Sequence, residues 1–188
     1  MAKLAVIGFS AGGIPLAQQL LAALPTAYPL PVVLVTHLPP TAGSGLLPLF
    51  QSVSRLPVKL AFDKQAIAAG NVYIAPPDYH LLVERNGHFA LSVDPPVKSV
   101  RPSVDVFLQS AAEVYEKHLI AVILSGANSD GADGMARVRA TGGVTIVLDP
   151  LQAEFRIMPD AVIEATDVDY VASLDEIISL LLAVQDHP

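Results

Sequence analysis

The sequence predicts an α/β fold: a doubly wound, mainly parallel sheet with helices on both faces and an antiparallel hairpin at one edge. Apolar runs rich in β-branched residues alternate along the chain with amphipathic segments, which is typical of strands joined by right-handed helical crossovers. In addition, 52% of the residues are hydrophobic and only 15% are charged, as expected for a sheet that is buried on both faces. We expect residues 1–188 to form a single domain.

The first half of the chain contains six short runs that predict strands, at residues 3–9, 31–37, 58–61, 72–75, 80–84 and 89–93. Two amphipathic segments predict helices at 14–24 and 44–53, with Pro15 tolerated in the first turn of the former. The turn sequence Pro76-Pro77-Asp78 separates two of the short strands. These turn signals predict the antiparallel hairpin.

The second half of the chain begins with a helix signal. Ser103 is a good N-cap and Asp105 suits the first turn, which predicts a helix that runs to about residue 117. HLIAVILSG, at 118–126, is the clearest buried strand in the sequence. Strands are expected next at 144–148 and 169–172, and helices at 131–140, 159–165 and 174–184. We expect the last helix to pack on the core; the sequence leaves the oligomeric state open.

Composition excludes several classes of protein. The net charge is −7 and the 11 basic residues are scattered, which argues against a nucleic-acid binder. No apolar run approaches the ~20 residues that span a bilayer, so we expect no membrane insertion. The chain has no cysteine, which excludes disulfides and thiolate-bound zinc, and we expect neither metal nor cofactor. The N-terminus fits a strand and turn better than a signal peptide, and we expect a cytoplasmic location.

Three chemically useful side chains follow predicted strands. Ser10 lies in GFSAGG after the first strand, His37 ends the second, and Asp130 lies in GANSDGADG after the strand at 118–126. Because ligands of parallel α/β sheets bind at the carboxyl ends of strands, these side chains are expected on one rim. A serine nucleophile needs a base, and that base needs an orienting carboxylate. The pattern therefore predicts a Ser-His-Asp triad.

Other interpretations fit parts of this pattern. GFSAGG resembles a phosphate-binding turn, although it lacks both the G-x-G-x-x-G spacing and a nearby lysine. Ser10 is also compatible with a simple turn or cap, and His37 with a structural histidine at a strand end. Asp133 competes with Asp130 for the role of the acid. Arg101 is equally compatible with a carboxylate-binding residue and with a surface ion pair.

A set of segments distributed along the chain resembles the catalytic domain of the CheB methylesterase family. The segments are GFSAGG, VVLVTHLPP, GNVYIAPPDYHLLV, VRPSVDVFLQSA, VILSGANSDGADGM, ATGGVTIVLDP and FRIMPDAVI, in that order, over about residues 4–182. The resemblance implies a doubly wound α/β domain with Ser10 as nucleophile, His37 as base and Asp130 as acid. It implies hydrolysis of glutamyl methyl esters on the cytoplasmic domain of chemoreceptors, with release of methanol, and in some members deamidation of receptor glutamines.

The resemblance also assigns residues that form the oxyanion site or line the substrate: Ala11, Gly12, Ala127, Asn128 and Met158. Two of these segments depart from the family pattern. The usual Ser-Thr-Gly-Gly has alanine at position 11, and the usual Gly-Met-Gly is here Gly126-Ala127-Asn128. The histidine that often precedes Arg101 is Val100.

Typical members carry an N-terminal receiver domain, for which this sequence leaves no room before its first strand. Either the sequence covers a catalytic domain excised from a longer protein, or the protein is a stand-alone esterase. The initial methionine favours the stand-alone esterase, which would be regulated by other means such as recruitment. The departures around Ser10 suggest one alternative, a protein of the same fold that docks on receptors or signalling proteins with little hydrolysis.

Overall fold

The computed structural model describes residues 4–37 and 45–183. Its main sheet contains β1 (Leu4–Phe9), β2 (Val32–Thr36), β3 (Val58–Leu60), β4 (Val72–Ile74), β7 (Leu119–Ile123), β8 (Val144–Leu148) and β9 (Tyr170–Ala172). The strand order is β3-β4-β2-β1-β7-β8-β9, and every neighbouring pair is parallel. The predicted parallel α/β sheet is therefore confirmed.

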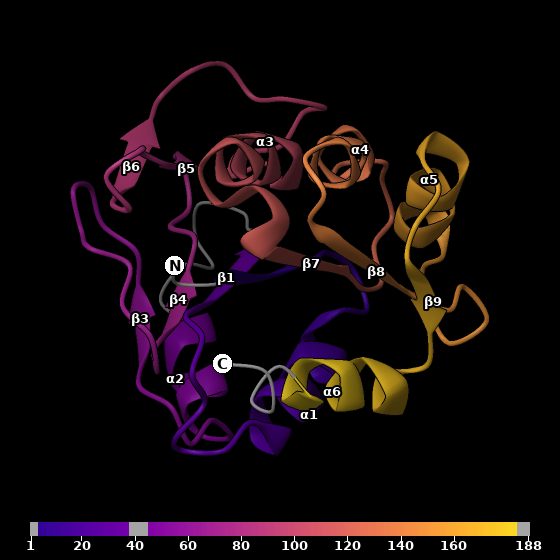
Figure 1. Ribbon diagram of the computed structural model, residues 1–188, viewed down its shortest axis with the longest axis horizontal. Coiled ribbons are helices and arrows are strands. Elements are labelled where there is room, and N and C mark those ends of the chain that lie inside the picture. The colour runs from indigo at the N-terminus through magenta and orange to yellow at the C-terminus, as the bar shows by residue number, and fades with distance from the viewer. Residues whose placement is uncertain (1–3, 38–44, 184–188) are drawn as a thin grey trace.

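Helices cover both faces of this sheet (Figure 1). On one face lie α1 (Ile14–Ala23), α2 (Leu46–Gln51) and α6 (Leu174–Ala183); on the other lie α3 (Val104–Tyr115), α4 (Ala132–Ala140) and α5 (Ile157–Ala165). A 3₁₀ turn, Glu116–His118, extends α3 toward β7. Alternate residues of the central strands face opposite sides, so Ile7 and Leu34 belong to one core cluster and Val6 and Val33 to the other. Burial on both faces explains why these strands are almost continuously apolar.

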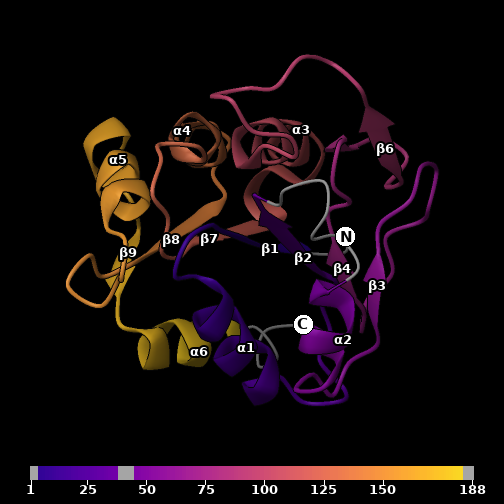
Figure 2. The ribbon, with the colours of Figure 1, turned by 180° about the vertical axis from the view of Figure 1, so that it is seen from behind.

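The antiparallel hairpin forms a small sheet of its own. It consists of β5 (His80–Val83) and β6 (Phe89–Ser92), which pair with each other and not with the edge of the seven-stranded sheet. Viewed from behind, β6 lies beside α3, outside the main sheet (Figure 2). Phe89 packs edge-on against Tyr73 of β4 and contacts Phe107 of α3, so the hairpin extends the core around α3.

Strand order places the ends of three strands side by side. The chain proceeds from β1 to β2 on one side and returns later to β7 on the other side of β1. The order of the strands thus reverses at β1, and the carboxyl ends beside such a reversal are where open α/β sheets bind ligands. None of the described helices has the length and hydropathy that a membrane span requires.

Candidate active site

Ser10 occupies a turn that only small residues can form. Its backbone N–H donates to the Ser125 carbonyl at 2.9 Å, and its own carbonyl accepts from Gly13 N–H at 3.0 Å. Gly12 has φ +73°, and a Cβ there would lie 2.8 Å from both the Glu154 Cβ and the Ser125 Oγ. Glycine at position 12 therefore permits both the backbone conformation and the close approach of Glu154. The turn delivers Ser10 to the start of α1, where backbone N–H groups favour negative charge.

His37 follows β2 and lies between the serine and the aspartate. Its Nδ1 is 3.1 Å from the Ser10 Oγ, and its Nε2 is 2.7 Å from the Asp130 Oδ2. A proton on Nε2 is donated to the carboxylate, which leaves Nδ1 with a lone pair toward the serine hydroxyl. The two ring nitrogens thus exchange the roles that they have in the chymotrypsin triad. The geometry supplies a serine with a base and a base with an acid.

Asp130 is a fully buried carboxylate with four hydrogen-bond donors: His37 Nε2 at 2.7 Å, Ser103 Oγ at 2.7 Å, Val104 N at 2.6 Å and Asp105 N at 3.1 Å. The two backbone donors belong to the first turn of α3. Burial alone raises the pKa of Asp130, but the hydrogen bonds from His37, Ser103 and Val104 outweigh it and lower that pKa. Asp130 is therefore held ionised, in the form that orients an imidazole.

Asp133, the competing acid, lies in a different environment. Its side chain is 66% exposed and pairs with the ammonium of Lys98 at 2.9 Å. The Lys98 Nζ also donates to the Asp105 Oδ2 at 2.7 Å and to the Ser129 carbonyl at 3.0 Å. Asp133 has no contact with His37 among the described residues, so the geometry favours Asp130 as the orienting carboxylate.

Asp105 does more than complement the dipole of α3, which is all that the sequence predicts for it. Its Oδ1 accepts from Gly131 N at 2.9 Å and from Gly134 N at 2.7 Å. Burial raises the pKa of Asp105, although the hydrogen bonds from Lys98 and Gly134 oppose that rise. Asp105 therefore fixes the chain immediately after Asp130 and joins α3 to the start of α4.

Met158 packs against Gly126 in the loop that follows β7. Gly126 N–H donates to the Phe155 carbonyl and Met158 N–H donates to the Gly126 carbonyl, both at 3.0 Å. A Cβ on Gly126 would lie 2.4 Å from the Met158 Sδ. Met158 itself is fully buried. The resemblance predicts that Met158 lines the substrate, but its side chain has no exposed surface and packs against Gly126 of this loop instead.

The residues expected at the oxyanion site lie in the two loops beside Ser10. Among residues 4–37 and 45–183, no acceptor takes a hydrogen bond from the backbone N–H of Ala11, Gly12 or Ala127. These groups remain candidate donors to an oxyanion. The Asn128 side chain is different, because its amide nitrogen lies 3.2 Å from the His37 Nδ1. The Asn128 side chain is therefore in contact with the base.

Two serine hydroxyls make contacts at the site that the sequence does not predict. The Ser125 hydroxyl donates to the Ala11 carbonyl at 2.8 Å and accepts from Phe155 N–H at 3.0 Å. The Ser103 hydroxyl donates to Asp130 and also accepts from Val106 N–H as the N-cap of α3. Only the capping role of Ser103 has a sequence signal, because its contact with Asp130 joins distant segments.

Other residues considered from the sequence have structural partners. The Arg101 Nη1 donates to the carbonyls of Val93 and Asp94, both at 3.0 Å, so neither interpretation proposed for Arg101 describes these contacts. The His80 Nε2 contacts the Pro95 carbonyl at 3.1 Å. Within the described ranges, no three His, Cys, Asp or Glu side chains gather as metal ligands would.

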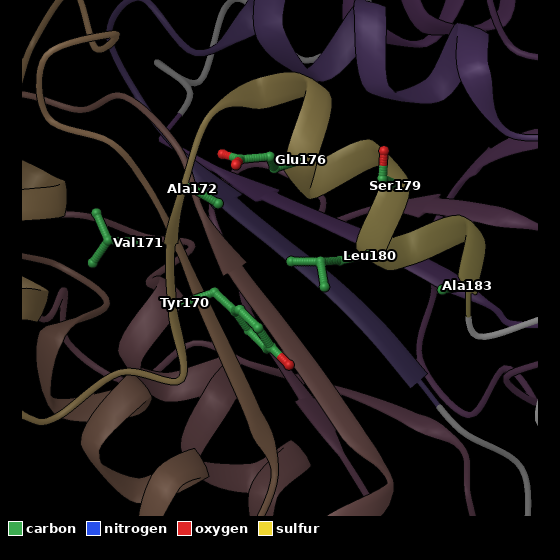
Figure 3. Close-up of a pocket in the computed structure, with 7 residues that line it drawn as sticks. All are labelled: Tyr170, Val171, Ala172, Glu176, Ser179, Leu180 and Ala183. Atoms are coloured by element: carbon green, nitrogen blue, oxygen red, sulfur yellow. The ribbon is translucent and has the colours of Figure 1, made fainter.

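A separate pocket of about 440 Å³ lies between β9 and α6, at the far edge of the sheet (Figure 3). Tyr170 and Leu180 extend toward it in the close-up, and none of Ser10, His37 and Asp130 lines it.

Comparisons with known proteins agree with this geometry. The family model for CheB methylesterase matches residues 5–181. A relative from Leptospira interrogans is 43% identical, and the match covers 97% of this chain and 94% of the relative. The protein-glutamate methylesterase/protein-glutamine glutaminase of Thermotoga maritima is 41% identical over 90% of this chain, which spans 50% of that relative.

The solved structures give the same result. The crystal structure of the Thermotoga maritima CheB methylesterase catalytic domain matches with a TM-score of 0.94 and 38% identity, covering 98% of this chain and 99% of that one. The family model covers most of the chain, and the Leptospira interrogans relative is 43% identical over nearly its whole length, so the chain belongs to the CheB methylesterase family.

Proposed function

We propose that this protein is a methylesterase that hydrolyses glutamyl methyl esters on the cytoplasmic part of chemoreceptors, with Ser10, His37 and Asp130 as its catalytic residues. One observation carries the proposal: an unbroken chain of hydrogen bonds runs from the Ser10 Oγ through both nitrogens of His37 to the ionised Asp130. The names of the relatives support both the esterase and the glutaminase activity. A receptor substrate of this kind implies a cytoplasmic location.

The reaction follows from the orientation of His37. The Ser10 Oγ attacks the ester carbonyl while its proton passes to Nδ1, and the oxyanion accepts hydrogen bonds from backbone N–H groups such as those of Ala11 and Ala127. The Nδ1–H then protonates the leaving methoxide, which departs as methanol and leaves a glutamyl ester on Ser10. Water, deprotonated by Nδ1, attacks this acyl-enzyme; the Nδ1–H then returns its proton to the Ser10 Oγ as the ester bond breaks, which releases glutamate and restores Ser10. In deamidation, ammonia replaces methanol as the leaving group.

Asp130 stays ionised throughout this sequence. Its carboxylate accepts the Nε2–H, which fixes the tautomer that exposes the Nδ1 lone pair. It also stabilises the imidazolium after the proton has arrived on Nδ1. Burial strengthens this interaction, because no solvent competes for the carboxylate.

Two other interpretations of the sequence lose ground. A protein that only docks on receptors has no support from the relatives, whose names describe hydrolases. A phosphate-binding function of the GFSAGG turn does not account for the hydrogen bond between Ser10 and His37.

The deciding experiment measures methanol release from a methylated chemoreceptor fragment. The wild-type protein should release methanol, and Ser10→Ala should reduce the rate by about 10³-fold or more, since the nucleophile is lost. Circular dichroism should show an intact fold in the variant, because Ser10 is held by backbone contacts. Equal rates in both proteins would reject Ser10 as the nucleophile.

A further inference from the structure

The side chain of Asn128 has a defined orientation. Its Oδ1 accepts a hydrogen bond from the backbone N–H of Asp130 at 3.2 Å, which an amide nitrogen could not do. The Nδ2 therefore faces the imidazole, 3.2 Å from the His37 Nδ1. Since an amide nitrogen only donates, the contact requires a lone pair on Nδ1.

Two donors thus converge on one nitrogen. The Ser10 hydroxyl and the Asn128 amide both point to the Nδ1 lone pair, at 3.1 and 3.2 Å. On the other side of the ring, Nε2 is committed to Asp130. The resting arrangement is satisfied only by a neutral ring protonated on Nε2.

Proton transfer from Ser10 reverses this situation. Once Nδ1 carries a proton, Nδ1–H and the Asn128 N–H are two donors that face each other, and their contact must break. When the proton passes to the leaving methanol, the lone pair returns and the contact can form again. Asn128 thus interacts favourably with one protonation state of the base and unfavourably with the other.

We propose that Asn128 is a positioning residue that holds His37 neutral, with its Nδ1 lone pair toward Ser10, and that opposes protonation of the ring. The proposal deepens the esterase function proposed above and rests on it for its catalytic meaning. At position 128 the usual family pattern has glycine, which has no side chain. The proposal gives a role to the asparagine side chain that this protein has there.

Among the described residues, one charged side chain forms an ion pair or hydrogen bond with the His37 ring. Asp130 is the carboxylate that touches His37. The ammonium of Lys98 reaches the neighbouring Ser129 carbonyl but is held by Asp105 and Asp133. Glu154 lies against Gly12 in the Ser10 turn. None of these is altered by a substitution at position 128, so its effect can be measured separately.

The test titrates the ring directly. Histidine labelled with ¹⁵N reports the tautomer and protonation of His37 by NMR, without any substrate. In the wild type, Nδ1 should appear as the unprotonated nitrogen. Asn128→Ala should raise the midpoint of the ring titration by about 0.5 pH unit, the effect of one modest hydrogen bond.

Asn128→Asp should raise the midpoint further, by about one unit or more, because its carboxylate accepts from Nδ1–H. Asn86→Ala, in the hairpin turn, is the matched control and should leave the titration unchanged. Coincident midpoints in the wild type and Asn128→Ala would overturn the proposal. Thermal melts establish that each variant is folded before it is titrated.

Methanol release as a function of pH supplies a second measurement. The acid limb of the rate profile should move in the same order, from wild type to Asn128→Ala to Asn128→Asp. An ordered NMR titration without methanol release from any protein would reject the esterase function and keep the role of Asn128. Methanol release with identical acid limbs and midpoints in all three proteins would support the esterase function and reject the role of Asn128.

Discussion

Two regions of this molecule differ in shape and in chemistry. The pocket between β9 and α6 is an open hollow of about 440 Å³, and its lining side chains form no buried charged network (Figure 3). The rim above β2, β1 and β7 holds a fully buried Asp130 with four donors, in direct contact with His37. Keeping a carboxylate ionised inside a protein requires such donors, and buried ionised groups of this kind are concentrated at functional sites. The buried charge, rather than the concave surface, identifies the candidate active site.

The largest expected effect comes from neutralising that charge. Asp130→Asn should lower kcat by about 10⁴-fold, because an amide no longer selects the tautomer that gives Nδ1 its lone pair. Asp133→Asn should change kcat by less than about threefold, since its exposed carboxylate pairs with Lys98 and, within the described residues, has no contact with His37. Methanol release by the two variants, measured side by side, checks the difference.

Both substitutions replace one oxygen by nitrogen at nearly constant volume, so each controls for the other. If Asp133→Asn were the more damaging change, the carboxylate in contact with His37 would not be the catalytic acid.

An intermediate effect is expected from Ser103→Ala. The variant loses a hydrogen bond to Asp130 and the N-cap of α3, which together should cost about 2 kcal/mol of unfolding free energy at pH 7. The pKa of Asp130 is lowered in the folded protein, so its ionisation stabilises the fold above the ordinary aspartate pKa. That contribution disappears as the pH falls through the lowered value.

The loss caused by Ser103→Ala should therefore be greatest near neutral pH and smaller in acid, where only the cap remains. Melting temperatures at several pH values measure this. Ser110→Ala is the matched control, because among the described residues its hydroxyl bonds to the backbone groups of Val83 and Phe107 and to no carboxylate. A loss in Ser103→Ala that does not change with pH would mean that Ser103 acts as a cap alone.

The smallest effect should come from the pocket. Tyr170→Ala removes a half-exposed ring from β9, several strands away from Ser10. We expect methanol release within about twofold of the wild type, as for surface changes remote from a site. A loss of tenfold or more, in a protein that still melts cooperatively, would connect the pocket to catalysis and undo the contrast between the two regions.

Much of this structure follows from local sequence patterns. The run Val32–Thr36 is β-branched and apolar because both faces of β2 are buried. Its end, like the end of β1, is marked by a change to small or polar residues, which is why Ser10 and His37 can be assigned to one rim. Asp130 is harder to assign to this rim from the sequence, because it lies several residues beyond the end of β7.

Local sequence patterns do not predict contacts between segments that are far apart in the chain. The separate hairpin depends on Phe89 packing against Tyr73 and Phe107, which no turn signal encodes. The burial of Met158 depends on the path of the Gly126 loop. The orientation of Asn128 likewise depends on where the backbone of Asp130 places its N–H. Each of these contacts joins groups whose relative positions follow from the folded backbone.

The pairing of β1 with β7 has a consequence for the time at which the enzyme becomes active. It joins Leu4 to Leu119, two residues separated by more than half of the chain, whereas β1 and β2 are close in sequence. Contacts of such long separation are slow to form, because a large loop must close first. Ser10 and His37 can approach each other early, but Asp130 joins them only after this closure. Hydrolysis would thus begin abruptly late in folding. The moment at which it begins would report when β1 pairs with β7.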